Sequence, residues 1–132
     1  MKKVVGFTLI ELLIVMAILA MLAALVGPAF FGSLGRGERS AAQTQIANFE
    51  SALDTYRLDV GRYPDSLEGL VTNDRGSSRW SGPYLRADAI PMDPWGNEYQ
   101  YQVTSNGRDF TLLSYGADGS PGGEGDDADI EY

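Results

Sequence analysis

The side chains in this sequence that could do chemistry are almost all carboxylates. The chain has 132 residues, with 18 Asp and Glu, 10 Lys and Arg, and neither His nor Cys. This composition excludes the usual zinc, haem and thiol chemistries and leaves hard oxygen atoms as the metal ligands on offer. The formal net charge of −8, without a basic stripe, also argues against binding to nucleic acid.

The carboxylates are densest between Tyr115 and Asp129, where glycines are interleaved with them and allow backbone carbonyls to turn inward. The acidic residues are Asp118, Glu124, Asp126, Asp127 and Asp129. Calcium accepts about six to eight oxygen ligands and tolerates irregular geometry better than magnesium does, although this spacing is not that of an EF-hand. The alternative is a solvated acidic tail that self-repulsion keeps disordered, and composition alone favours that alternative.

An enzymatic role has little support in these residues. Pairs of Asp and Glu can act as general acid and base, and Ser can act as a nucleophile. The chain has no His or Cys, no glycine-rich phosphate loop that opens a helix after a strand, and no evident cleft around the acidic cluster. We therefore predict that the protein is not an enzyme.

Another carboxylate, Glu11, is the one charged residue in an apolar stretch from Phe7 to Phe31. As a helix, the uncharged residues 12–31 would span roughly the hydrocarbon core of a bilayer. An ordinary cleaved signal peptide is the alternative, but its apolar region is usually about 7 to 15 residues and ends in a small-x-small site. Ala23-Ala24-Leu25 matches such a site poorly. We therefore predict a single transmembrane helix.

The charges around this helix predict its orientation. Lys2 and Lys3 precede the apolar stretch and an acidic remainder follows it, which places the N-terminus in the cytoplasm by the positive-inside tendency. The C-terminal domain is then expected outside the cytoplasm. An ionisable residue within a membrane segment is costly enough to suggest a function and a partner for Glu11. Its position alone fits equally well with a carboxylate at the headgroup level.

The periodicity of the sequence predicts the remaining elements. Gly27-Pro28 predicts a kink or local unwinding of the helix, because proline lacks an amide proton and its ring clashes with the preceding turn. Helical periodicity returns over residues 40–58, and a possible short helix follows at 66–71. The apolar face of the longer helix carries Ile46, Phe49, Leu53 and Tyr56. Residues 99–103 and 110–113 alternate as strands around a turn at 105–107, which predicts an antiparallel hairpin.

The segment Gly6-Phe7-Thr8-Leu9-Ile10-Glu11, followed by a long apolar helix, resembles the cleavage and methylation site of type IV pilins and their secretion relatives. The resemblance implies that a prepilin peptidase cuts after Gly6 and that the new amine on Phe7 is methylated. It also implies that Glu11 neutralises the N-terminus of a neighbouring subunit during assembly. A carboxylate beside an ammonium group recovers much of the cost of its burial. Pro28 matches the helix-breaking proline that is common in these proteins.

The C-terminal half resembles the major pseudopilins of type II secretion systems more specifically. The resemblance lies in the order and spacing of three groups of residues. These are Arg62-Tyr63-Pro64 with Leu67-Glu68-Gly69-Leu70, Gly82-Pro83-Tyr84-Leu85, and Asp93-Pro94-Trp95-Gly96-Asn97-Glu98-Tyr99. Considered from its residues alone, the last group predicts a tight turn that leads into a strand, with Trp95 and Tyr99 in the core. Recognition of exported cargo by these aromatic residues is the less favoured alternative.

The resemblance implies a structural subunit of the type II secretion pseudopilus, which assembles in the inner membrane and periplasm and drives the export of folded proteins through the outer membrane. The expected partners are further copies of the chain, a prepilin peptidase, minor pseudopilins and the inner-membrane assembly platform. The alternative is a type IV pilus pilin, with a role in adhesion, motility or DNA uptake. Such pilins usually carry a larger head and often a cysteine pair.

We expect an α+β fold in which a long N-terminal helix packs on a small antiparallel sheet, with a C-terminal metal-binding loop. The expected parts are a leader peptide at residues 1–6, a transmembrane helix at 7–31, an amphipathic helix at 32–60, and a periplasmic head at 61–132. The head includes a calcium loop at residues 115–129.

Three segments near the C-terminus resemble the calcium loop of the pseudopilins: Gly116-Ala117-Asp118-Gly119, Pro121-Gly122-Gly123 and Ala128-Asp129-Ile130. In that loop, two aspartate side chains and several carbonyls bind the ion, so the resemblance reverses the preference for a disordered tail. It implies that Asp118 is the first aspartate. The second is Asp126, Asp127 or Asp129, of which Asp127 and Asp129 are favoured. Tyr115 and Ser120 would offer carbonyls.

Overall fold

The computed structural model describes residues 6–132 of the chain. Most of the predicted leader peptide, including Lys2 and Lys3, lies outside the described residues. The chain divides into two compact units, of which the first ends at Gly35 and the second covers Arg36–Tyr132. We call the second the head unit and describe the two units separately.

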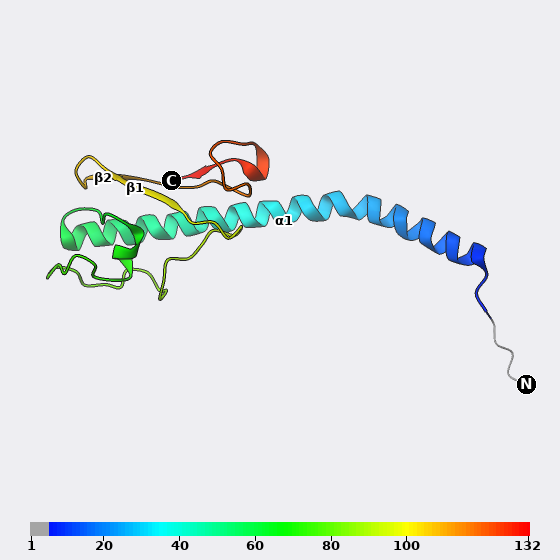
Figure 1. Cartoon of the computed structure of the whole chain (residues 1–132), viewed down its shortest axis with the longest axis horizontal. Helices are drawn as coiled ribbons and strands as arrows, with labels where there is room; N and C mark the ends of the chain where they lie inside the picture. The colour runs from blue at the N-terminus through cyan, green and yellow to red at the C-terminus, as the bar shows by residue number, and fades with distance from the viewer. Residues whose placement is uncertain (1–5) are drawn as a thin grey trace, which may run out of the picture. The chain divides into compact units, whose positions relative to one another are not determined.

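One α-helix, α1, contributes to both units and runs from Leu9 to Val60 (Figure 1). The next residue, Gly61, stops the helix with a φ of +92°, which lies in the left-handed region that favours glycine. The local unwinding predicted at Gly27-Pro28 is wrong for the single chain, because α1 continues through Pro28 without a break. Proline at this position removes one backbone hydrogen bond. Ala24, Leu25 and Ala29 on its two sides are strong helix formers, whereas Gly27 and Gly32 are weak ones.

The first unit presents its apolar side chains to the outside. Leu9, Ile14 and Leu25, for example, are 79%, 53% and 78% exposed. Among the described residues, α1 is the one helix that is long and apolar enough to cross a membrane, and none of its most apolar window is buried within the chain. These side chains therefore need an apolar environment that residues 6–132 do not provide.

The head unit contains a small sheet and two short 3-10 helices (Figure 1). The elements in chain order are η1 (Leu67–Leu70), β1 (Gln100–Thr104), β2 (Asp109–Ser114), η2 (Gly125–Asp127) and β3 (Ile130–Glu131). The strands form an antiparallel sheet in the order β1-β2-β3. The predicted hairpin is therefore confirmed, with Val103 opposite Phe110, and positive φ angles at residues 105–107 form its turn. The short helix predicted at 66–71 is η1.

The apolar face of α1 packs against this sheet, as predicted. Ile46, Phe49, Leu53 and Tyr56 are at most 3% exposed. They form one core cluster with Tyr99, which directly precedes β1, and with the sheet residues Phe110, Leu112 and Ile130. The rings of Phe49 and Tyr99 meet edge to face, with their centroids 5.1 Å apart. Burial raises the pKa of Tyr99 to about 12, so its hydroxyl stays protonated at neutral pH. The arrangement of a long helix on a small antiparallel sheet is confirmed.

Candidate functional site

Glu11 closes a capping box at the start of α1. The carboxylate of Glu11 accepts hydrogen bonds from the backbone N–H of Thr8 at 2.8 Å and from its hydroxyl at 2.9 Å. The N–H of Glu11 in turn donates to the Thr8 hydroxyl oxygen at 3.3 Å. A threonine followed three residues later by glutamate satisfies N–H groups that the first helical turn leaves unpaired. This role was missed, although the sequence Thr8-Leu9-Ile10-Glu11 is a direct signal for it.

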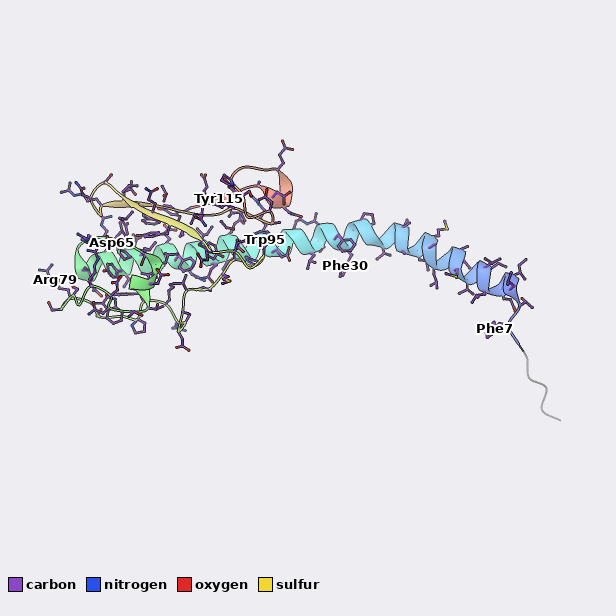
Figure 2. All side chains as sticks on the ribbon, in the orientation of Figure 1. Phe7, Phe30, Asp65, Arg79, Trp95 and Tyr115 are labelled. Atoms are coloured by element: carbon purple, nitrogen blue, oxygen red, sulfur yellow. The ribbon has the colours of Figure 1, made fainter. Side chains whose placement is uncertain are left out.

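The predicted processing residues lie just before this cap. Gly6 and Phe7 precede the first residue of α1, and the Phe7 side chain is 90% exposed and labelled in Figure 2. A Cβ placed on Gly6 would meet no atom of the described residues within 4 Å. The fold itself therefore does not require glycine at position 6. Pro28 lies inside α1 and is also exposed.

The segment Asp93-Pro94-Trp95-Gly96-Asn97 forms the tight turn that its sequence predicts. Asp93 is 4% exposed, and its carboxylate accepts N–H hydrogen bonds from Trp95 at 3.1 Å and from Asn97 at 2.8 Å. It also accepts a hydrogen bond of 2.7 Å from the hydroxyl of Ser114 at the end of β2. Because all these partners surround one buried carboxylate, Asp93 fixes the turn beside the start of the C-terminal loop.

Two aspartates accept hydrogen bonds within the C-terminal loop, residues 115–129, and one of them reaches across it. The carboxylate of Asp118 accepts the N–H of Ser120 at 3.0 Å. The carboxylate of Asp129 accepts the N–H of Gly122 at 3.0 Å, across seven residues of chain. Asp129 is half-buried, whereas Asp126 and Asp127 are exposed in η2. The structure therefore distinguishes Asp129 from its two neighbours as the aspartate that reaches into the loop.

The residues of this loop suit a hard cation that is held mainly by carbonyl oxygens. Among residues 6–132, no three acidic side chains are gathered as a metal site. A Cβ on Gly116 would lie 2.8 Å from the carbonyl oxygen of Asp126, and one on Gly123 would lie 2.6 Å from that of Asp127. Both glycines have positive φ angles. Only glycine permits such close approach of carbonyl groups, and carbonyls with few carboxylates are an acceptable donor set for calcium.

Two residues of α1 hold the neighbouring loops, and sequence reasoning missed both. The Glu38 carboxylate accepts the indole N–H of Trp95 at 3.0 Å. Arg39 donates to backbone carbonyls of Gly125, Ala128 and Asp129. Trp95 and Tyr115 are labelled at this end of the head unit in Figure 2, whereas Asp65 and Arg79 lie toward its other end. These hydrogen bonds join residues at least 57 positions apart, so local sequence patterns carry no signal for them.

Two family models match this chain. The model for protein G of the type II secretion system matches residues 29–132, which include the end of the apolar stretch, the sheet and the C-terminal loop. The model for the prokaryotic N-terminal methylation motif matches residues 1–27, which include the cap at Thr8 and Glu11. Together the two models cover all of the chain except residue 28.

Individual proteins with similar sequences support the same assignment. The type II secretion system core protein G of Pseudomonas aeruginosa is 42% identical over 132 residues, which are 95% of this chain and 92% of the relative. That of Vibrio cholerae is 40% identical over 98% of this chain and 92% of the relative. The crystal structure of the major pseudopilin from the type 2 secretion system of enterohaemorrhagic Escherichia coli has a TM-score of 0.58 and 32% identity. The match covers 76% of this chain and 90% of that chain.

Proposed function

This chain belongs to the type II secretion system protein G family and is a structural subunit of the pseudopilus, and we propose that α1 anchors it in the inner membrane with the head unit in the periplasm. The observation that carries this proposal is the direct succession of the methylation motif and the protein G match along one chain. The apolar N-terminal part of α1 fits an inner-membrane anchor. The family is structural rather than enzymatic.

The same succession of matches supports a processing step before assembly. A prepilin peptidase cuts after Gly6 and exposes the amine of Phe7, which becomes methylated. The position of Gly6, before the cap and free of packing contacts with the described residues, supports access of a peptidase to this bond. Glu11 then neutralises the N-terminus of a neighbouring copy during polymerisation. Mass spectrometry of the N-terminus in assembled filaments tests this assignment.

The partners of the mature chain follow from its place in the filament. Further copies of the chain would cover the apolar side chains of the first unit once they leave the lipid. Minor pseudopilins and the inner-membrane assembly platform are the other partners. The protein G match over residues 29–132 favours this assembly over a type IV pilus with a role in adhesion, motility or DNA uptake.

We further propose that the C-terminal loop binds calcium. The side chains of Asp118 and Asp129 and the carbonyls of Tyr115 and Ser120 would hold the ion. Asp129 is preferred to Asp126 and Asp127 because it is half-buried and its carboxylate already folds back across the loop. When bound, calcium would neutralise part of the negative charge that the acidic side chains place in this loop.

Chelation of calcium is expected to lower the melting temperature of the head unit. Calcium that binds only the folded state adds RT ln(1 + [L]/Kd) to the free energy of unfolding, which is about 2.7 kcal/mol when the calcium concentration is a hundred times Kd. For a unit of this size, that free energy corresponds to a change in melting temperature of roughly 10 to 20 °C. The measurement is thermal melting of the detergent-solubilised chain, with calcium or with chelator, in wild type and in Asp118→Ala.

The matched control is Asp88→Ala, which removes an exposed aspartate from another loop. We expect Asp118→Ala to lose the calcium-dependent increase in melting temperature and Asp88→Ala to retain it. Equal melting temperatures for wild type with calcium and with chelator would rule the site out.

A further inference from the structure

We infer that Arg39 is a positioning residue for the calcium loop, which it orders from α1 before the ion binds. This inference rests on the proposed calcium binding. Arg39 fixes the backbone of residues 125–129, and this fixed backbone directs the carboxylate of Asp129 back across the loop.

The guanidinium of Arg39 donates hydrogen bonds to carbonyl oxygens of the loop. Its Nη1 atom donates to Gly125 at 3.1 Å and to Ala128 at 3.0 Å, and its Nη2 atom donates to Asp129 at 3.4 Å. The side chain is half-buried, and the contacts to Ala128 and Asp129 are partly shielded from water. A planar guanidinium can bridge several carbonyls in a fixed geometry, which a lysine ammonium cannot do equally well.

Asp129 connects this anchor to the proposed ion site. Its carbonyl accepts from Arg39, while its carboxylate accepts the N–H of Gly122 on the opposite arm of the loop. The backbone and the side chain of this one residue are therefore both held. The carbonyls bound by Arg39 are not those proposed as calcium ligands, Tyr115 and Ser120. Arg39 therefore supports the loop and does not occupy the place of the ion.

A second connection holds the start of the same loop. The indole N–H of Trp95 donates to the carboxylate of Glu38, the neighbour of Arg39 in α1. Two residues further on, the side-chain amide of Asn97 donates to the carbonyl of Gly116 at 3.5 Å. The loop is thus held near both ends by contacts that lead back to adjacent residues of one helix. A preformed loop pays less ordering entropy when a ligand binds, so its affinity is higher.

The test compares Arg39→Met and Arg39→Lys with the control Arg36→Met, which removes an exposed arginine from the same helix. Calcium chloride is titrated into the detergent-solubilised chain by calorimetry, and amide hydrogen exchange is measured in chelator. We expect Arg39→Met to raise the Kd for calcium about tenfold, equivalent to about 1.4 kcal/mol. Arg39→Lys should raise it less, and Arg36→Met should leave it unchanged. Exchange at Gly122 and Ala128 in chelator should be faster in Arg39→Met.

A role in general stability alone would lower the melting temperature of Arg39→Met equally with calcium and with chelator, without a change in Kd. That result would overturn the inference and leave calcium binding intact. If Arg39→Met does not fold, equal Kd values for wild type and Arg39→Lys would overturn it in the same way. Absence of calcium binding in wild type would instead overturn the calcium proposal and this inference with it.

Discussion

Glu11→Ala is expected to reach the membrane in normal amounts but to form filaments in much lower yield. Loss of the carboxylate removes a charge from the apolar segment, so insertion should not suffer. In the filament, the N-terminal ammonium of a neighbouring chain would lose its partner, and breaking a buried pair in this way costs about 3 to 5 kcal/mol. This is roughly a hundredfold or more in the association constant. The measurement is the amount of chain in purified filaments, divided by the amount of chain inserted in the membrane, for the variant and for wild type.

Glu11→Gln separates the charge of this residue from its role in the helix cap. Glutamine can also complete a capping box with Thr8, but it brings no charge to the neighbouring ammonium. If charge pairing drives assembly, both variants should assemble poorly. Normal filament yield from Glu11→Gln together with poor yield from Glu11→Ala would show that only the cap matters, and would refute the pairing role.

Gly6→Leu is expected to accumulate almost entirely as the uncleaved precursor. A Cβ at this position would meet no described atom within 4 Å, so the fold should tolerate the leucine. The peptidase, in contrast, must accept an extended backbone and a small side chain at the bond that it cuts. The processed fraction, read from the mass of the membrane-bound chain, should fall from nearly all to nearly none.

Gly32→Leu serves as the matched control for this experiment. It introduces the same side chain at another glycine where a Cβ would meet nothing within 4 Å among the described residues. Gly32 lies outside the segment that resembles the cleavage site, so this variant should be processed like wild type. Complete processing of Gly6→Leu would refute the assignment of the cut to the Gly6-Phe7 bond.

The elements that follow from local patterns could be predicted from the sequence. The spacing of Phe49, Leu53 and Tyr56 identified the buried face of α1, and alternation around residues 105–107 identified the β1-β2 hairpin. The turn at Asp93 also followed from its residues, because aspartate, proline and glycine have defined backbone preferences. The family assignment rested on such local segments as well, and the protein G match confirms it.

Features that depend on tertiary contacts could not be predicted in this way. Strand β3 has two residues, too few to show alternation, and it forms only because β2 offers an open edge. The hydrogen bonds of Glu38 and Arg39 join segments far apart in sequence. The local unwinding at Pro28 was mispredicted, because α1 tolerates the loss of one backbone hydrogen bond there.

The N-terminal mass of the chain in purified filaments tests the central claim most directly. We expect purified filaments to contain this chain, beginning at methylated Phe7 after loss of residues 1–6. Assembled chains that retain Met1, or that begin beyond Ala24 as a secreted protein would after signal-peptide cleavage, would contradict it.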